Sequence, residues 1–134
     1  MVLQPSYKIR HKKTLSILTK GMESMDATSE ETVFQIILHG GNGKSLAMEA
    51  IQLAKKGDIQ AAKDKIKEAE QSINEAHHVQ TALIQNEVSG NKNEVSLLMV
   101  HAQDHLMTAI TIKDLAAEMI DLYDLLNKKG VTLP

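Results

Sequence analysis

Apolar residues recur at steps of three and four positions in three successive segments of the chain. Such steps bring side chains onto one face of an α-helix, so the pattern predicts three helices from about residue 28 onward. The recurring positions of the first segment are Val33, Ile37, Gly40, Ala47, Ile51 and Ala54. Those of the second are Ile59, Ala62, Ile66, Ala69, Ile73, Ala76, Gln80 and Leu83. Those of the third, which runs from about Val95 to Lys128 at heptad spacing, are Leu98, His101, His105, Thr108, Ile112, Leu115, Met119, Leu122 and Leu126.

The residues between these segments favour helix ends and short turns. Thr28 and Glu31 have the spacing of a capping box at the start of the first helix. Gly57 can end that helix and Asp58 can cap the next one, so the second helix must run back along the first. The stretch VSGNKNE (88–94) predicts the second turn. The chain is therefore expected to be all-α and to form an antiparallel three-helix bundle.

The third predicted helix is apolar on more than one side. After Lys113 it has an ordinary polar face, made of Asp114, Glu118, Asp121 and Asp124. Before Lys113 two further stripes accompany the heptad positions, namely Leu97, Val100, Asp104 and Met107, and Met99, Ala102, Leu106 and Ala109. A helix that is apolar nearly all round is buried nearly all round. Because two neighbours in a small bundle cannot cover all of this surface, we infer that the protein self-associates.

Composition and charge limit the possible classes of function. The chain has 134 residues, enough for one domain with a substantial core. It contains no cysteine, which excludes disulfides, thiolate metal sites and cysteine nucleophiles. Residues 1–25 carry a net charge of +4 and the remaining residues a net charge of −6. An acidic body is a poor nucleic-acid binder, so we expect no nucleic acid among the partners.

The same charge asymmetry divides the chain into two parts. Residues 1–25 are predicted to be a basic, disordered extension, or to lie upstream of a true start at Met22 or Met25. They lack the apolar core of a secretory signal. Residues 26–134 are predicted to form the folded domain, and no apolar run in the chain is long enough to span a bilayer.

The stretch GGNGKS (40–45) ends like a phosphate-binding P-loop. That motif also requires a glycine five residues before Gly43, where this chain has Leu38, and a strand before the loop. The preceding VFQIILH instead continues a helical pattern. We therefore interpret these glycines as small residues that let helices approach closely, or as a local helix irregularity.

The candidate chemistry lies in SLLMVHAQDHLMTAI, where His101, Asp104 and His105 stand among apolar residues. Their spacing projects all three onto neighbouring parts of one helix surface, with Gln103 between them. A zincin motif would have Glu directly after the first histidine, where this chain has Ala102. These groups could be satisfied core polar residues that fix helix register. Clustered ionisable groups at an expected subunit contact favour a chemical site.

Three stretches of the chain resemble one known family. VSLLMVHAQDHLMTAI is similar to the active-site helix of the lactose/cellobiose/chitobiose-type enzyme IIA of the bacterial phosphoenolpyruvate-dependent sugar phosphotransferase system. INEAHHVQTALIQNEVSG and GGNGKSLAMEAIQLAKKGD resemble the second and first helices of that family. The resemblance extends from about residue 30 to residue 128 and does not cover residues 1–25.

This resemblance implies a homotrimer of three-helix subunits and a role for individual residues. His101 matches the histidine that accepts a phosphoryl group, and Gln103, His105 and Gln80 match supporting positions near it. Asp104 matches an aspartate that meets its two symmetry mates around one Mg²⁺ per trimer, on the threefold axis. The chemistry is consistent, because a neutral imidazole is a competent nucleophile and three converging carboxylates require a compensating cation.

The resemblance also implies partners and a location. The phosphoryl group would come from the histidine-containing phosphocarrier protein and pass to enzyme IIB, for import of a β-glucoside-type disaccharide such as cellobiose or chitobiose. The protein would be cytoplasmic and reach the membrane only through the enzyme IIC permease. Two alternatives from other classes remain, a structural helical interaction module and a metal-dependent hydrolase that uses His101, His105 and Asp104 on one metal.

Overall fold

The computed structural model describes residues 27–131, and the side chains of residues 30–131. These residues form three α-helices, α2 (Ala27–Lys55), α3 (Ile59–Val88) and α4 (Leu97–Lys128). The prediction of three helices in an all-α domain is therefore confirmed for the described residues. The extension predicted for residues 1–25 lies outside them, and the division at residue 26 stays a prediction. In the described part of the chain, no helix has the length and apolar character needed to cross a membrane.

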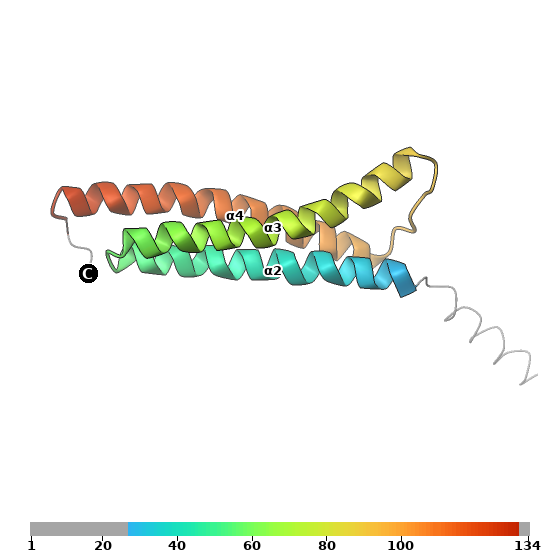
Figure 1. The fold of residues 1–134 in the computed structure, drawn as a ribbon, viewed down its shortest axis with the longest axis horizontal. Helices are drawn as coiled ribbons and strands as arrows, with labels where there is room; N and C mark the ends of the chain where they lie inside the picture. The colour runs from blue at the N-terminus through green and yellow to red at the C-terminus, as the bar shows by residue number, and fades with distance from the viewer. Residues whose placement is uncertain (1–26, 132–134) are drawn as a thin grey trace, which may run out of the picture. The chain divides into compact units, whose positions relative to one another are not determined.

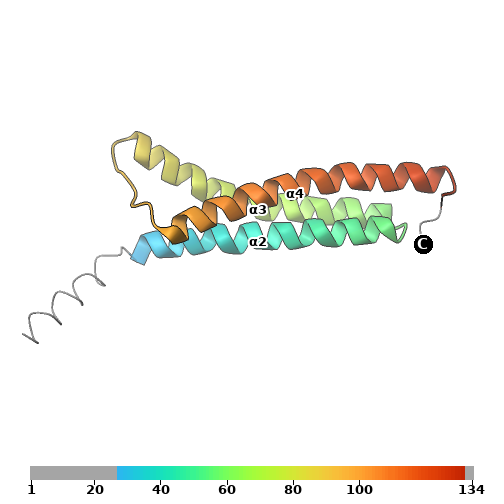
Figure 2. The same ribbon diagram turned by 180° about the vertical axis from the view of Figure 1, so that it is seen from behind.

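From Thr32 onward the helices form one compact unit. Figure 1 shows α3 running back alongside α2, and α4 returning in the direction of α2. The side-chain pairs between α2 and α3 follow the same order, because Asn42 contacts Ser72 while the later Glu49 contacts the earlier Lys65. The end of α3 diverges from the start of α4, and an irregular segment (89–96) joins them (Figures 1 and 2).

The end of α2 and the starts of α3 and α4 follow from local chemistry. Gly57 has a positive φ of 92°, which ends α2, and the Asp58 carboxylate accepts a hydrogen bond from the backbone N–H of Ala61 at 3.1 Å. Both positions confirm the predicted turn. The predicted start of the third helix was two residues early, because Ser96 is its N-cap and accepts from the backbone N–H of Met99. The predicted capping box is wrong, since α2 already includes Ala27 and Thr28 therefore lies inside the helix.

The core of the bundle is made largely of alanine. Among the described side chains, Ile36, Leu106 and Ile120 are the large ones that are completely buried. The buried alanines are Ala47, Ala50, Ala54, Ala62, Ala69, Ala76, Ala102, Ala109 and Ala116. Small side chains at a contact shorten the distance between helix axes, so the three helices pack closely.

The core positions of α2 and α3 agree with the predicted faces, whereas those of α4 do not. Ala102, Leu106, Ala109, Ala116 and Ile120 are the buried residues of α4. The heptad positions His101, Thr108, Leu115, Met119 and Leu122 are exposed. Because α4 is apolar on several sides, periodicity alone could not select the inner one. The alanine-containing stripe is buried, where small side chains allow close packing.

The glycines of α2 lie where the helices come together. A Cβ atom on Gly40 would lie 3.5 Å from the Cα of Leu106 in α4. One on Gly43 would overlap the Cγ1 atom of Ile73 and lie 3.0 Å from the carbonyl oxygen of Ala69, both in α3. Since α2 is continuous through residues 40–45, the interpretation as close helix approach is confirmed and the local irregularity is wrong.

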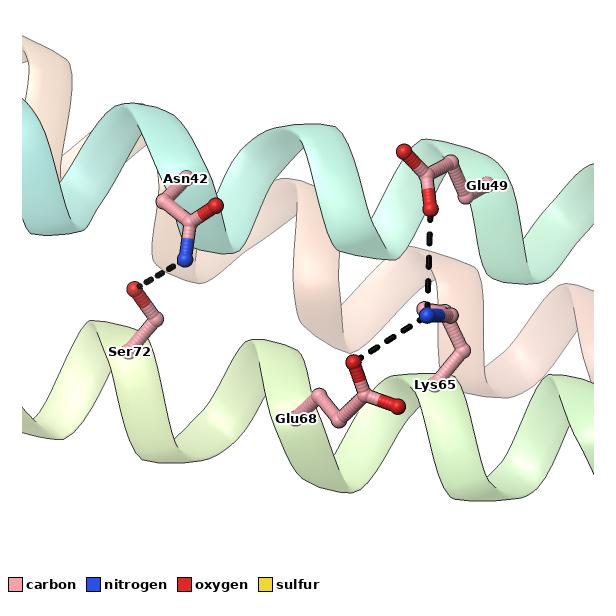
Figure 3. Close-up of polar contacts among 5 residues, drawn as sticks. All are labelled: Asn42, Glu49, Lys65, Glu68 and Ser72. Atoms are coloured by element: carbon pink, nitrogen blue, oxygen red, sulfur yellow. Dashed lines mark hydrogen bonds and ion pairs between the residues drawn. The ribbon is translucent and has the colours of Figure 1, made fainter.

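Polar contacts between α2 and α3 accompany the alanine packing (Figure 3). The Asn42 amide donates to the hydroxyl of Ser72 at 3.0 Å, and this buried hydroxyl donates to the backbone carbonyl of His39 at 2.9 Å. Lys65 lies 3.9 Å from Glu49 across the two helices and 3.1 Å from Glu68 on its own helix. A buried hydroxyl left without a partner costs free energy, so these contacts favour one register of α2 on α3.

Two glycine substitutions should change stability in opposite directions. Gly57→Ala should lower the free energy of unfolding by roughly 1–2 kcal/mol, because an L side chain is strained at positive φ. Gly40→Ala should leave it unchanged or raise it by up to about 1 kcal/mol, because Ala is the better helix former and its Cβ makes only ordinary contact. Urea unfolding at matched protein concentration measures both. A Gly57→Ala variant as stable as the parent would contradict this account of the turn.

Candidate functional site

The candidate residues lie in the N-terminal half of α4 and differ in exposure. His101 and Asp104 are exposed, while Gln103 and His105 are partly buried. Gln80, on α3, is 7% exposed. At about 100° per residue, His101 and Asp104 project about 60° apart around the helix, and Gln103 projects about 160° away from His101. The structure therefore separates the candidates into two groups on different sides of α4.

The first group is the pair of histidines. The imidazole rings of His101 and His105 are stacked, with centroids 5.7 Å apart and an interplanar angle of 27°. The spacing of four residues places both rings on the same side of α4. His105 also meets α2, because a Cβ atom on Gly41 would lie 3.0 Å from its Nε2 atom. Sequence reasoning assigned no residue of α2 to the site, although the double glycine did indicate close packing there.

The second group is a pair of glutamines between α3 and α4. The side-chain amide of Gln80 donates to the carbonyl oxygen of Gln103. The same Gln80 amide lies 4.0 Å from the sulfur of Met107, and the Gln103 amide lies 3.9 Å from that of Met99. Within one chain Gln80 of α3 and Gln103 of α4 thus face each other, on the side of α4 opposite the stacked histidines.

Asp104 stands on an exposed apolar surface. Its neighbours Leu97, Val100 and Met107 are 85%, 51% and 52% exposed. A groove of about 530 Å³ adjoins this surface where α3 diverges from α4. Its lining includes Ile84, Val95, Val100, Gln103, Asp104 and Met107. The stripe predicted to need a partner is therefore uncovered in a single chain.

The exposed apolar surface continues past Lys113, where a polar face was predicted. Leu115, Met119, Leu122 and Leu125 are all exposed, alongside the predicted acidic residues. With a helical repeat of 100° per residue, Leu97, Asp104, Leu115 and Leu122 project within about 20° of one direction. The predicted polar face is present, but the heptad positions Leu115, Met119 and Leu122 share the exposed surface with it. Asp104 is a carboxylate on a leucine seam, which we define as Leu97, Asp104, Leu115 and Leu122.

The donor set on this seam is suited to a shared cation. Carboxylate oxygens are the ligands that Mg²⁺ prefers. Within the described part of one chain, no three His, Asp or Glu residues come together as a potential metal site. His101, His105 and Asp104 span about 100° of α4, so the structure does not bring them to one point, as the hydrolase alternative would require. In the described part of one chain, Asp104 therefore belongs to no metal-binding cluster.

The other histidines lie elsewhere. His39 contacts the side chain of Gln35 at 3.1 Å on α2. His77 lines a separate pocket of about 270 Å³ with Glu70 and Lys113, between α3 and α4. His11 lies outside the described residues. The stacked pair on α4 is therefore the site that combines clustered imidazoles with an uncovered apolar surface.

Comparison with known proteins agrees with this arrangement. The family model described as "PTS system, Lactose/Cellobiose specific IIA subunit" matches residues 31–124. The chain is 59% identical over 100 residues to the lichenan-specific phosphotransferase enzyme IIA component of Bacillus subtilis, covering 75% of this chain and 91% of that protein.

Solved structures of enzyme IIA proteins also match this chain. The cellobiose-specific enzyme IIA of Bacillus anthracis matches with a TM-score of 0.76 and 55% identity, covering 81% of this chain and 99% of that chain. The IIA(Chitobiose)–HPr complex of Escherichia coli matches with a TM-score of 0.65 and 43% identity, covering 73% of this chain and 95% of that chain. This chain therefore belongs to the lactose/cellobiose-specific IIA family of the phosphotransferase system, whose members are phosphotransferase components that carry a phosphoryl group on histidine.

Proposed function

We propose that this chain accepts a phosphoryl group on His101 from the histidine-containing phosphocarrier protein and passes it to enzyme IIB. The observation that carries the proposal is the exposed imidazole of His101, stacked on His105 at the edge of an uncovered apolar surface. A relative that was solved in complex with HPr, the histidine-containing phosphocarrier protein, supports the assignment of the donor.

The chemistry needs an accessible nucleophile and little acid–base work. A ring nitrogen of neutral His101 forms a new P–N bond while the P–N bond of the donor's phosphohistidine breaks, and the electron pair of that bond returns to the donor's imidazole. In-line approach requires His101 to be reachable from solvent, as its exposure allows. His105, four residues on, is stacked on the His101 ring, so it would help to orient that ring and to hold a bound phosphoryl oxygen.

The leucine seam supports a homotrimer of antiparallel three-helix subunits. In this assembly the seams of three α4 helices meet at the threefold axis and bury the exposed leucines against one another. The three Asp104 carboxylates then converge, and their mutual repulsion requires compensation. One Mg²⁺ held by the three Asp104 side chains would neutralise this charge. His101 projects about 60° from the seam, so it stays at the edge of the interface, where a protein donor can reach it.

The transported sugar is proposed from the relatives. The similar proteins carry the names lichenan-, cellobiose- and chitobiose-specific. We therefore propose a β-glucoside-type disaccharide, cellobiose or chitobiose, as the sugar that the corresponding permease imports.

Removal of the His101 imidazole should abolish phosphoryl labelling of the chain. After incubation with phosphoenolpyruvate, enzyme I and the phosphocarrier protein, intact mass should show one phosphoryl group per chain, labile in acid and stable in base. His101→Ala should remain unlabelled. His77→Ala, which removes an exposed imidazole from α3, should label like the parent. Labelling that survives His101→Ala and disappears with His77→Ala would place the acceptor on α3.

Replacement of Asp104 tests the seam. Asp104→Leu removes a repelling carboxylate triad, and exchange of buried charges for packed apolar groups is often neutral or stabilising by roughly 1–4 kcal/mol. The variant should stay trimeric with chelator present, melt no lower than the parent and still accept phosphate on His101. Asp114→Leu changes a carboxylate about 80° from Asp104 around α4 and should leave the metal response of the parent unchanged. Sedimentation equilibrium that finds monomeric Asp104→Leu would refute the threefold arrangement.

A further inference from the structure

A segment of α2 lies next to the stacked histidines, and the phosphoryl-transfer chemistry alone assigns no role to it. Two adjacent glycines, Gly40 and Gly41, occupy the stretch of α2 that passes α4 next to His105. A Cβ atom on Gly40 would lie 3.5 Å from the Cα and 3.7 Å from the backbone nitrogen of Leu106. The backbones of α2 and α4 are therefore close at this point, and little space separates them.

His105 occupies the space that a side chain at position 41 would need. A Cβ atom on Gly41 would lie 3.0 Å from the Nε2 atom of His105 and 3.8 Å from its Cδ2 atom. A separation of 3.0 Å is tighter than the van der Waals distance at which such atoms attract. The Nε2 edge of the His105 ring thus faces the bare backbone of α2, while the ring is stacked on that of His101. A side chain at position 41 would therefore require the His105 ring to shift by a few tenths of an ångström.

We propose that Gly41 is a positioning residue for phosphoryl transfer, because its missing side chain lets His105 take the position in which it orients the His101 ring. This inference rests on the proposed role of His101. A carbon at position 41 would push the His105 ring a few tenths of an ångström away from α2 and so change its stacking with His101. The in-line attack depends on the direction of the His101 nitrogen lone pair, and small misplacements of reacting groups reduce rates strongly.

The expected melting temperature of Gly41→Ala distinguishes a positioning role of Gly41 from a general loss of the fold. Ala favours a helix interior over Gly, so Gly41→Ala should not lower the melting temperature. It should nevertheless slow phosphoryl acceptance at saturating phosphocarrier protein by about tenfold, within the loss that misplacements of this kind produce. A slower variant that melts no lower than the parent cannot owe its defect to unfolding. Gly40→Ala makes the same change one residue earlier. Its Cβ atom would lie at ordinary contact distances, 3.5 Å from the Cα of Leu106 and 3.8 Å from the Cδ2 of His105, so it should transfer at the parent rate.

The experiment compares the full-length parent, Gly41→Ala, Gly40→Ala, His105→Ala and the Gly41→Ala/His105→Ala double variant. Transfer rates come from rapid-quench labelling, and ring positions from ¹⁵N-edited NMR of the histidine side chains. Gly41→Ala should shift the His105 and His101 ring signals and slow transfer, and should have no further effect when His105 is already alanine. Parent-like ring signals with a parent-like rate in Gly41→Ala would overturn the proposal. Equal slowing by Gly41→Ala with and without His105 would also overturn it, because Gly41 would then act independently of that ring.

Failure of this inference is distinguishable from failure of the proposed function. If the parent were not labelled on His101, the proposed acceptor would be wrong. The ring signals of His105 in the unphosphorylated protein would still report whether Gly41 sets the position of that ring. If the parent were labelled and the ring signals of Gly41→Ala matched it, only the positioning role would be refuted.

Discussion

The structure depends on one packing constraint, the small size of the side chains between its helices. Within residues 30–131, nine buried positions are alanine and three large side chains are completely enclosed. Burial stabilises by roughly 0.8 kcal/mol per CH₂ group, so an alanine core contributes little per residue. The close packing also places large apolar residues outside, among them Phe34, Leu38, Leu115 and Leu122. A single chain of this kind is therefore expected to gain much of its stability from contacts with other copies.

The same constraint determines how α4 is oriented. Its surface has three parts: an alanine stripe, the leucine seam and the stacked histidines. Its alanine stripe faces the core, and this orientation turns the leucine seam outward with Asp104 in the middle. The stacked His101 and His105 project between the core and the seam, on the side where α2 approaches. The position of His101 is thus a geometric consequence of which stripe is buried. A substitution that rotated α4 to bury a larger stripe would move both the carboxylate and the imidazoles.

Much of this architecture could be predicted from the sequence, because its signals are local. The helix period, Gly57 and Asp58 determined three helices and the first turn, and the spacing of His101, Asp104 and His105 indicated a shared surface. The inner side of α4 could not be predicted, since a helix that is apolar on several sides gives periodicity no unique answer. The exposure of Leu115, Met119 and Leu122 could not be predicted either, because these residues continue the heptad positions that the periodicity assigned to the buried side. The role of Gly41 depends on a contact with a residue more than sixty positions away, and the Gln80–Gln103 pair on the opposite side of α4 is likewise a product of tertiary packing.

We propose that copies of this chain associate through the outer face of α4 and that each copy carries one phosphoryl group at the edge of that contact. Native mass spectrometry after incubation with phosphoenolpyruvate, enzyme I and the phosphocarrier protein measures both properties on one particle. The account predicts a particle of three chains that carries up to three phosphoryl groups. A monomer, or a three-chain particle that acquires no phosphoryl group beside a fully labelled phosphocarrier protein, would contradict it.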